Sequence, residues 1–308
     1  MKYLFILFAC AMVSIFAATS IAALDQDDVR GAFLVSRPKE KTQNTNTAPK
    51  TSRRRPRPST GADSTKKNNS GTATTGSSTS TTGTTNTSTS NTKTKPAPVN
   101  APRMGIGLTL FMRDANGLAI RTDPTHVFQK GDRVRVLLET NADGYLYIFN
   151  TTNNGPAVML YPNAELDEAG NYLQAHVPFE IPSSAAVEER LRWLAFDENA
   201  GDERLFFVFT REPLPGVPID DDLISYCGDK KGCSWKPTDE IWSQIQKEMS
   251  HPLKTDREKQ YGAPQTEREQ QASNRGLGLA KEDPPPSLIM MASANTSRLV
   301  TTLDLIHK

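Results

Sequence analysis

Two cysteines near the middle of the chain have the clearest chemical meaning. Cys227 and Cys233 lie in the run YCGDKKGC, where Gly228 and Gly232 allow the loop between them to close. Two thiolates without a second Cys/His pair nearby make a poor zinc site, and the spacing is not the C-x-x-C of redox pairs. We therefore predict a structural disulfide formed in an oxidising compartment, which contributes about 2 kcal/mol in the chain-entropy model.

Histidines and carboxylates are the next candidates for chemistry. None of the four histidines lies four residues from another or beside a cysteine, as a metal motif would require: His126, His176, His251 and His307. His176 and Glu180 could form an acid–base pair, although an exposed strand histidine is the commoner role. Three adjacent aspartates at 220–222 could chelate a cation, but in an extended chain they point apart, which favours a solvated charge run. We therefore predict no catalytic, cofactor-binding or metal-ligating residue, while a site assembled from distant residues would leave no motif.

The elements that must position any site are mainly β-strands. Val134, Val136 and Leu138 alternate with a mostly polar row, which predicts one face on a core and one towards water. Residues 145–149 are apolar on both faces, as is typical of a strand between two layers. Further short strands are expected at residues 106–112, 118–121, 125–128, 157–161, 193–196, 205–210 and 299–306, with partial alternation over 172–181.

Short helices complete the expected fold. A helix over residues 238–249 would begin at Thr238, followed by acids that oppose the helix dipole, and a shorter one could cover 185–191. We thus predict a mainly β fold, an antiparallel β-sandwich that is immunoglobulin-like in general architecture, with one or two short helices. Tyr145 and Tyr147 could form an exposed contact surface or could pack inside the sandwich.

The start of the chain predicts export. Residues 1–23 combine Lys2, an apolar run and small residues at the end, which is the pattern of a cleavable secretory signal. An uncleaved anchor is the alternative, since this run could just cross a bilayer of about 30 Å. Residues 24–37 form a short segment that could add a strand to the later domain, dock elsewhere or remain unstructured. We expect an extracytoplasmic protein, in the periplasm, on the outer surface or secreted.

Residues 38–98 are predicted to be a disordered tether. They contain no Val, Ile, Leu, Met, Phe, Tyr or Trp, so burial cannot offset the entropy of ordering. A flexible coil of this length has ends roughly 40–50 Å apart on average. The segment is basic, with eleven Lys/Arg and two Asp/Glu. A cluster within it could contact an anionic surface or simply aid solubility: Arg53, Arg54, Arg55 and Arg57.

Residues 99–308 are expected to form one β-rich domain. They are acidic, with 22 Lys/Arg and 30 Asp/Glu, and long enough for one well-buried core. The stretch near 251–287 is polar and includes three consecutive prolines, which predicts a mobile excursion from that domain.

Four strand motifs carry a resemblance to a known family: GDRVRV at 131–136, DGYLYIFN at 143–150, LYPN at 160–163 and FFVFTREP at 206–213. Together they resemble the bacterial family called domain of unknown function 4384, over roughly residues 105–213, with the C-terminal strand as a further candidate. The resemblance implies an accessory or interaction module attached to signal peptides, linkers or unrelated domains. It supplies no catalytic residue.

Two hypotheses of function follow. The first is an exported, tethered, non-enzymatic β-sandwich module that binds a protein or polymer in the bacterial cell envelope. The alternative is an exported hydrolase acting on cell-wall glycan or peptide, which a cleft with paired carboxylates would support. No cofactor is predicted. We expect no nucleic-acid partner, and membrane contact only through the N-terminal signal or the basic linker.

Overall fold

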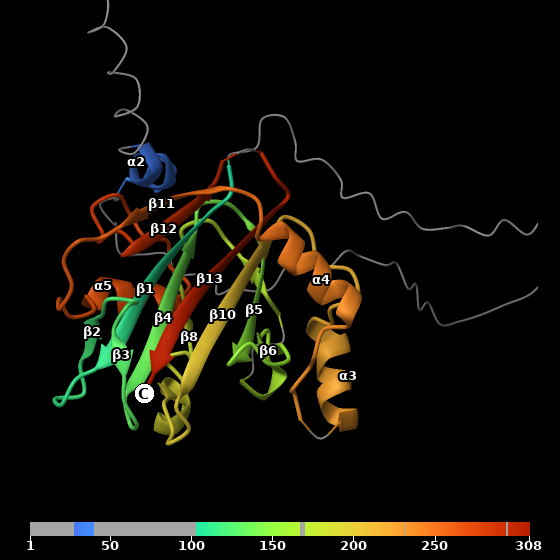
Figure 1. Cartoon of the computed structure of the whole chain (residues 1–308). Helices are drawn as coiled ribbons and strands as arrows, with labels where there is room; N and C mark the ends of the chain where they lie inside the picture. Colours follow the sequence, from blue (N-terminus) through green and yellow to red (C-terminus); the bar gives the residue numbers. More distant parts are fainter. Residues whose placement is uncertain (1–27, 40–102, 167–169, 231, 294) are drawn as a thin grey trace, which may run out of the picture.

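The structure is a computed structural model of the whole chain. It describes residues 28–39, 103–166, 170–230, 232–293 and 295–308. The predicted signal at 1–23 lies outside the described residues, and so does nearly all of the predicted linker, with its four-arginine cluster. The described part of the chain is mainly β, as predicted, with two sheets in a sandwich-like arrangement and short helices outside them (Figure 1).

Sheet A contains seven strands of the described chain in the order β11-β12-β1-β4-β8, with β2 paired to β1 and β9 paired to β4. All of these pairings are antiparallel. The strands are β1 (Gly105–Arg113), β2 (Ala119–Arg121), β4 (Arg133–Thr140), β8 (Phe179–Ile181), β9 (Leu194–Ala195), β11 (Leu253–Arg257) and β12 (Leu288–Ala292).

Sheet B contains six strands of the described chain in the order β3-β13-β10-β5-β6, with β7 paired to β5. Its pairings are antiparallel except that of β13 with β3, which is parallel. The strands are β3 (Val127–Phe128), β5 (Gly144–Thr152), β6 (Val158–Tyr161), β7 (Tyr172–Leu173), β10 (Gly201–Thr210) and β13 (Arg298–His307).

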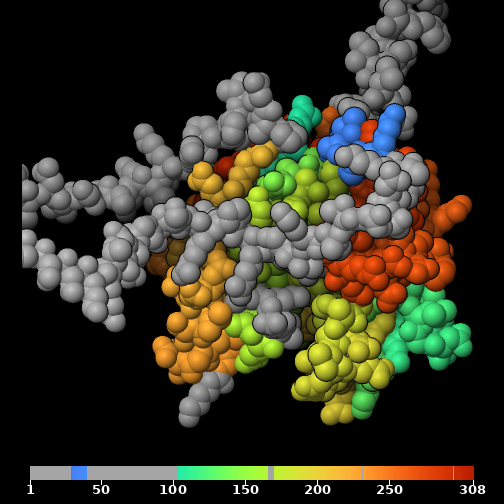
Figure 2. Space-filling model, turned by 180° about the vertical axis from the view of Figure 1, so that it is seen from behind, coloured from blue at the N-terminus to red at the C-terminus, as the bar shows by residue number. Residues whose placement is uncertain are grey.

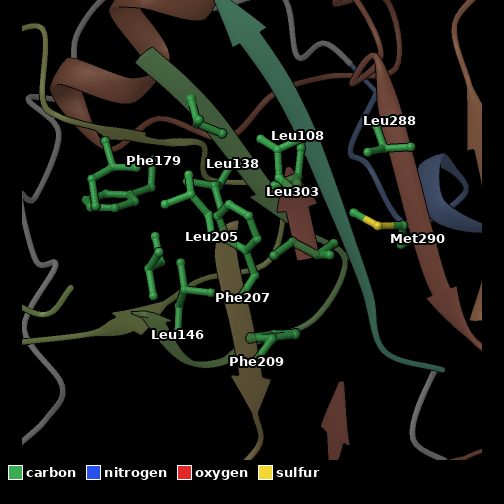
Figure 3. Packing of buried hydrophobic residues seen from close by; sticks show 14 of the residues in the cluster. Leu108, Leu138, Leu146, Phe179, Leu205, Phe207, Phe209, Leu288, Met290 and Leu303 are labelled. Atoms are coloured by element: carbon green, nitrogen blue, oxygen red, sulfur yellow. The ribbon is translucent and has the colours of Figure 1, made fainter. Parts of the chain in front are cut away.

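The main core lies between the two sheets. The alternating apolar rows of β1 and β4 meet those of β5, β10 and β13 there, as Leu108, Leu138 and Phe207 illustrate (Figure 3). Strand β5 is buried on both faces. Leu146 and Ile148 face this core, whereas Tyr145 and Tyr147 belong to a second apolar cluster on the other side of sheet B. The prediction of a strand between two layers is therefore confirmed.

Four α-helices occur among the described residues, more than the one or two predicted. They are α2 (Asp28–Leu34), α3 (Asp220–Lys230), α4 (Asp239–Glu248) and α5 (Glu267–Arg275), with 3-10 turns at η1 (Ala164–Leu166) and η2 (Glu189–Arg192). Helix α4 begins as predicted, since the Thr238 hydroxyl accepts a hydrogen bond from the Ile241 backbone N–H. Side chains of α3 and α4 pack with the outer face of sheet B, where Leu223 and Ile245 are buried.

Three segments differ from an expectation or resolve one that the sequence left open. Of the alternatives for residues 24–37, residues 28–34 form a helix docked on sheet A rather than an added strand, and residues 189–192 form a 3-10 turn where a short helix over 185–191 was considered. The segment expected as an excursion at 251–287 contains strand β11 and helix α5. Helix α5 shows little apolar periodicity because the side chains it buries are Glu269, Ala272 and Ser273.

Candidate functional site

The outer face of sheet A holds the N-terminal segment, which we define as residues 28–39. Helix α2 lies against β11 and β12, where Val29 and Phe33, one turn apart, pack on Ile289 and Met291. Figure 2 shows the helix in blue against the orange-red C-terminal elements. A small cavity of about 40 Å³ lies beside the helix, next to Lys254 and Met291. We define the docking groove as the surface of β1, β4, β11 and β12 that residues 28–39 cover.

Two glycines of β1 form the floor of the docking groove. A Cβ atom on Gly105 would lie 2.9 Å from Cδ2 of Phe33. A Cβ atom on Gly107 would lie 3.2 Å from Cζ of Phe33 and 2.3 Å from Cγ of Pro286. Because neither position has a side chain, the phenyl ring and the proline pack directly on the strand backbone. Complete burial of a phenylalanine contributes about 1.5–3 kcal/mol, which makes Phe33 the apolar anchor of the segment.

Arg37 is the polar anchor of the segment and is fully buried. Its Nε donates to Oε1 of Glu139 at 2.8 Å, and its Nη2 donates to Oε2 of the same carboxylate at 2.5 Å. The guanidinium also donates to the backbone oxygens of Ala280, Asp283 and Pro284 at 2.9–3.1 Å. Those oxygens lie in residues 276–287, which we call the strap. Arginine suits this position because its planar guanidinium can donate to the Glu139 carboxylate and to the strap carbonyl oxygens at the same time.

His176 connects the pocket to the surface. It is buried, and its ring contacts the Phe33 ring edge-to-face at 5.7 Å between centroids. Nδ1 lies 2.7 Å from Oε1 of Glu139, and Nε2 lies 2.7 Å from Oγ of Ser36, which is exposed. The backbone of His176 has a φ of 58°, in the left-handed region. Two backbone hydrogen bonds of 2.7 Å stabilise this conformation. The His176 N–H donates to the Thr140 carbonyl oxygen, and the His176 carbonyl oxygen accepts from the Leu279 N–H.

Hydrogen bonding determines the ionisation of Glu139. Burial alone would raise the pKa of its carboxyl group, but the hydrogen bonds from Arg37 and His176 outweigh burial and lower the pKa below the ordinary value. An ionised carboxylate only accepts hydrogen bonds, so neutral His176 must carry its proton on Nδ1. Nε2 is then an acceptor, and the nearer of the two acceptors open to the Ser36 hydroxyl is Nε2 at 2.7 Å, since the Phe33 carbonyl oxygen lies at 3.4 Å. Arg37, Glu139, His176 and Ser36 thus form one connected polar row.

Two further ion-pair clusters lie on the same side of sheet A. Arg121 on β2 bonds to Glu269 of α5 and donates to Oγ of Ser287 at 3.1 Å. Arg135 on β4 lies with its guanidinium 4.2 Å from the centre of the Trp193 ring and 3.7 Å from the carboxylate of Glu180. Burial lowers the pKa of Arg135, and Glu180 opposes that shift. The Arg121 contacts hold α5 and the strap onto the sheet, whereas the Arg135–Glu180 pair joins β4 to β8, so we assign both clusters a structural role.

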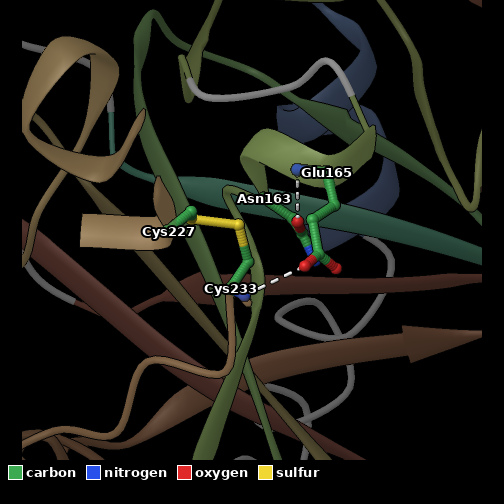
Figure 4. The surroundings of a disulfide bond; sticks show 4 residues. All are labelled: Asn163, Glu165, Cys227 and Cys233. Carbon is green, nitrogen blue, oxygen red and sulfur yellow. Dashed lines mark hydrogen bonds between the residues drawn. A yellow bond between two sulfur atoms is a disulfide. The ribbon is translucent and has the colours of Figure 1, made fainter. Parts of the chain in front are cut away.

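The predicted cysteine pair is brought together at the end of α3. The sulfurs of Cys227 and Cys233 lie at disulfide distance, 2.05 Å apart (Figure 4). Oε1 of Glu165 accepts a hydrogen bond from the Cys233 backbone N–H at 3.2 Å. The disulfide therefore connects α3 to the chain that leads into α4. Helix α3 lies on the far side of the molecule from α2 (Figure 1).

The structure also places the other residues that the sequence singled out. His176 is not an exposed strand residue and does not pair with Glu180, because its ring bonds to Glu139. The aspartates at 220–222 are exposed, as a solvated charge run implies, but they begin α3 rather than lie in extended chain. Tyr145 and Tyr147 are buried beneath the helical layer, so they do not form an exposed contact surface. Burial raises the pKa of Tyr147, whose hydroxyl accepts a hydrogen bond from the Leu214 N–H.

The sequence reasoning missed Ser36, Arg37 and Glu139. Glu139 belongs to the polar row of β4 that was expected to face water, but the N-terminal segment covers that row. The paired glycines at 105 and 107 were the available signal, since alternate glycines in a strand often mark a place where another group approaches the backbone closely.

Comparison with known proteins identifies one part of the chain. Residues 127–213 match the family model described as Domain of unknown function (DUF4384). This is the family that the strand motifs resemble. The DUF4384 region includes Glu139 and His176, but it leaves out the N-terminal segment, β1 and the strap. No curated protein and no solved structure matches the chain significantly.

Within the described ranges, no group of three or more His, Cys, Asp and Glu side chains is placed to hold a metal ion. None of the helices described here is both long and apolar enough to cross a membrane.

Proposed function

We propose that the protein is an exported interaction module of the bacterial cell envelope, and that its docking groove binds a polypeptide segment of a partner in place of its own residues 28–39. The observation that supports this role is the N-terminal segment itself. The sandwich holds this separate helical peptide through an apolar anchor at Phe33 and a charged anchor at Arg37. Helix-in-groove binding of this kind is a recurring mode of peptide recognition.

The groove defines the chemistry of its ligand. Val29, Phe33 and Arg37 follow one another at intervals of four residues, and all three are buried. A partner segment should therefore offer two apolar side chains one helical turn apart, followed after about one more turn by an arginine. A lysine would fit less well, because Glu139 and the strap oxygens accept a planar fork of donors rather than a single ammonium group.

The docked segment also changes how the predicted tether would be used. Residues 28–39 and β1 both belong to the same folded unit, so residues 40–102 connect two parts of one domain. Because residues 40–102 run between two parts of one domain, they do not act as a spacer between the folded domain and the predicted leader at 1–23. We infer that attachment to a membrane or wall layer runs through the residues before 28, with the docking groove close to that attachment.

Export is supported by the leader pattern at 1–23 and by the cysteine pair, which suits an oxidising compartment. Cell fractionation of the full-length protein would test this part of the proposal. Recovery with the cytoplasmic fraction, with the leader uncleaved and both thiols reduced, would contradict it.

The alternative of a glycan hydrolase receives less support. Glycosidases use two carboxyl groups that flank the scissile bond as acid and as base or nucleophile. On the outer face of sheet A, the three buried glutamates are each bonded to or paired with an arginine: Glu139 with Arg37, Glu180 with Arg135 and Glu269 with Arg121. Carboxylates held in this way are not free to shuttle protons to a sugar.

In-cell photo-cross-linking tests the interaction role. A photoreactive residue placed at Lys254, on β11 beside α2, should yield a discrete adduct with one protein. The matched control is the same residue at Ile224, which is 54% exposed on α3 in the opposite layer. Mass spectrometry would identify the partner. Absence of an adduct from Lys254, or identical adducts from both positions, would contradict binding at the docking groove.

A further inference from the structure

Docking of the N-terminal segment completes a row of three side chains that the sandwich alone does not contain. Ser36 comes from the segment, whereas Glu139 and His176 come from β4 and the turn after β7. Oγ of Ser36 lies 2.7 Å from Nε2 of His176, and Nδ1 of His176 lies 2.7 Å from Oε1 of Glu139. A hydroxyl, an imidazole and a carboxylate in this order form the arrangement that activates a serine nucleophile.

The direction of the hydrogen bonds suits proton abstraction. Glu139 accepts from Nδ1, so the lone pair of Nε2 faces the hydroxyl of Ser36. The left-handed backbone of His176 is bonded on both sides to neighbouring strands and strap, and Phe33 packs on the ring. The imidazole is therefore held in place before any substrate arrives, which is a requirement for an effective general base.

We propose that Ser36, His176 and Glu139 form an acyl-transfer site that hydrolyses carboxylic esters. Ser36 is the nucleophile, His176 is the general base, and Glu139 is a positioning residue that fixes the tautomer of His176. Because Ser36 is exposed, the substrate class is an ester on the outside of a larger molecule, such as an acylated polymer, that can approach an open surface.

The reaction balances with water as the only co-reactant. Ser36 Oγ forms a bond to the acyl carbon while its proton moves to Nε2 of His176. The bond from the acyl carbon to the alcohol oxygen then breaks, and the alcohol leaves with that proton. Water attacks the acyl-serine, passes a proton to Nε2, and Ser36 recovers it as the carboxylic acid is released.

The rate enhancement expected from this site favours esters over amides as substrates. A positioned general base contributes about 10²–10⁴-fold. Arg37 already neutralises much of the charge on Glu139, which reduces the stabilisation available to an imidazolium ion. A moderate rate increase is enough for an ester, whose alcohol departs readily, but not for a peptide bond. The inference goes beyond the proposed interaction role, because labelling of Ser36 requires no partner.

Phosphonylation of the purified full-length protein with diisopropyl fluorophosphate tests the site. The reagent forms an Oγ–phosphorus bond and releases fluoride, and peptide mapping by mass spectrometry locates the product. We expect Ser36 to react about 100-fold faster than Ser250, an exposed serine whose hydroxyl donates to the Lys247 carbonyl. Ser36→Ala should abolish the fast product, and because Ser36 is exposed this change should leave the fold intact.

The dependence of labelling on pH separates a base-assisted serine from a structural one. Glu139→Gln and His176→Gln could undock the segment, so the measurement uses the wild-type chain. With a positioned general base, the rate for Ser36 should level off as the pH is raised. An unassisted serine would keep accelerating tenfold per pH unit with hydroxide. A rate for Ser36 no greater than that of Ser250, or one that never levels off, would overturn the proposal.

Discussion

Arg37 and Glu139, 102 residues apart in the sequence, form a buried two-pronged ion pair that attaches the N-terminal segment to sheet A. The side chains of both residues are almost fully shielded from water. The pair replaces hydration with five donated hydrogen bonds, of which two go to the carboxylate and three to strap carbonyls. Such a pair favours this one docked arrangement, because burying either charge without its partner would strongly destabilise the folded protein.

The first prediction is that Arg37→Ala releases the N-terminal segment. Removing one partner of a buried ion pair costs about 3–5 kcal/mol, and undocking relieves that cost by returning Glu139 to water. Hydrogen exchange across residues 28–39 should therefore become fast, and the melting temperature should fall. Arg37→Lys should produce a smaller effect, since a lysine keeps the charge but loses the fork.

Arg30 provides a matched control within the same segment. It forms an ion pair with Asp256 whose side chains are 29% and 28% exposed. Partly exposed pairs of this kind contribute about 0–1 kcal/mol, so Arg30→Ala should leave residues 28–39 protected. Equal loss of protection in both variants would show that the docking groove does not distinguish the two arginines.

The second prediction concerns two glycines with opposite effects. Gly107→Ala should displace the strap and thereby loosen the segment, because its Cβ atom would lie 2.3 Å from Cγ of Pro286 in the strap and 3.2 Å from Cζ of Phe33. Overpacking of this kind costs about 1–3 kcal/mol. Gly31→Ala meets nothing within 4 Å and lies in helix α2, so it should stabilise the docked helix by about 0.5–1 kcal/mol. Protection of the α2 amides from hydrogen exchange, measured in both variants, would test the pair.

The third prediction is a loss of docking in acid. The pKa of Glu139 in the folded protein lies below its ordinary value of 4.5, so its ion pair contributes fully above that pH. The contribution is lost as the pH falls through the lower, folded value. Stability measured by urea unfolding from pH 7 to pH 3 should therefore decline more steeply in the wild type than in Glu139→Gln. Parallel acid limbs in the two proteins would contradict this linkage.

The fold was more accessible to sequence reasoning than the docking groove. Period-two patterns predicted β1 and β4, because one buried face imposes alternation on a strand, whereas β5 was predicted from a run that is apolar on both faces. The same rule misassigned Arg135 and Glu139, since it expects the polar row to face water. Their burial depends on coverage by the N-terminal segment and by α5, which are distant in the chain. A short-range sequence pattern cannot predict that a distant segment will cover these residues.

The polar helices show the same limit. Helix α5 has a capping box, Thr266 with Glu269, that is readable as T-x-x-E. It lacks an apolar stripe because Glu269 is buried against Arg121 rather than against a hydrophobic surface. Where buried ion pairs replace apolar contacts, hydrophobic periodicity cannot indicate which face of a helix is inside.

The last prediction concerns the disulfide between Cys227 and Cys233. Reduction should lower the free energy of unfolding by about 2 kcal/mol, since the bond closes a short loop and stabilises mainly by restricting the unfolded chain. Cys227→Ser combined with Cys233→Ser should reproduce the effect, and reductant should then cause no further loss. The docking groove lies in the opposite layer, so protection of residues 28–39 should persist in the double variant. Protein taken from its native compartment should show no reactive thiol apart from Cys10 of any retained leader, and titration of two further thiols would refute the bond.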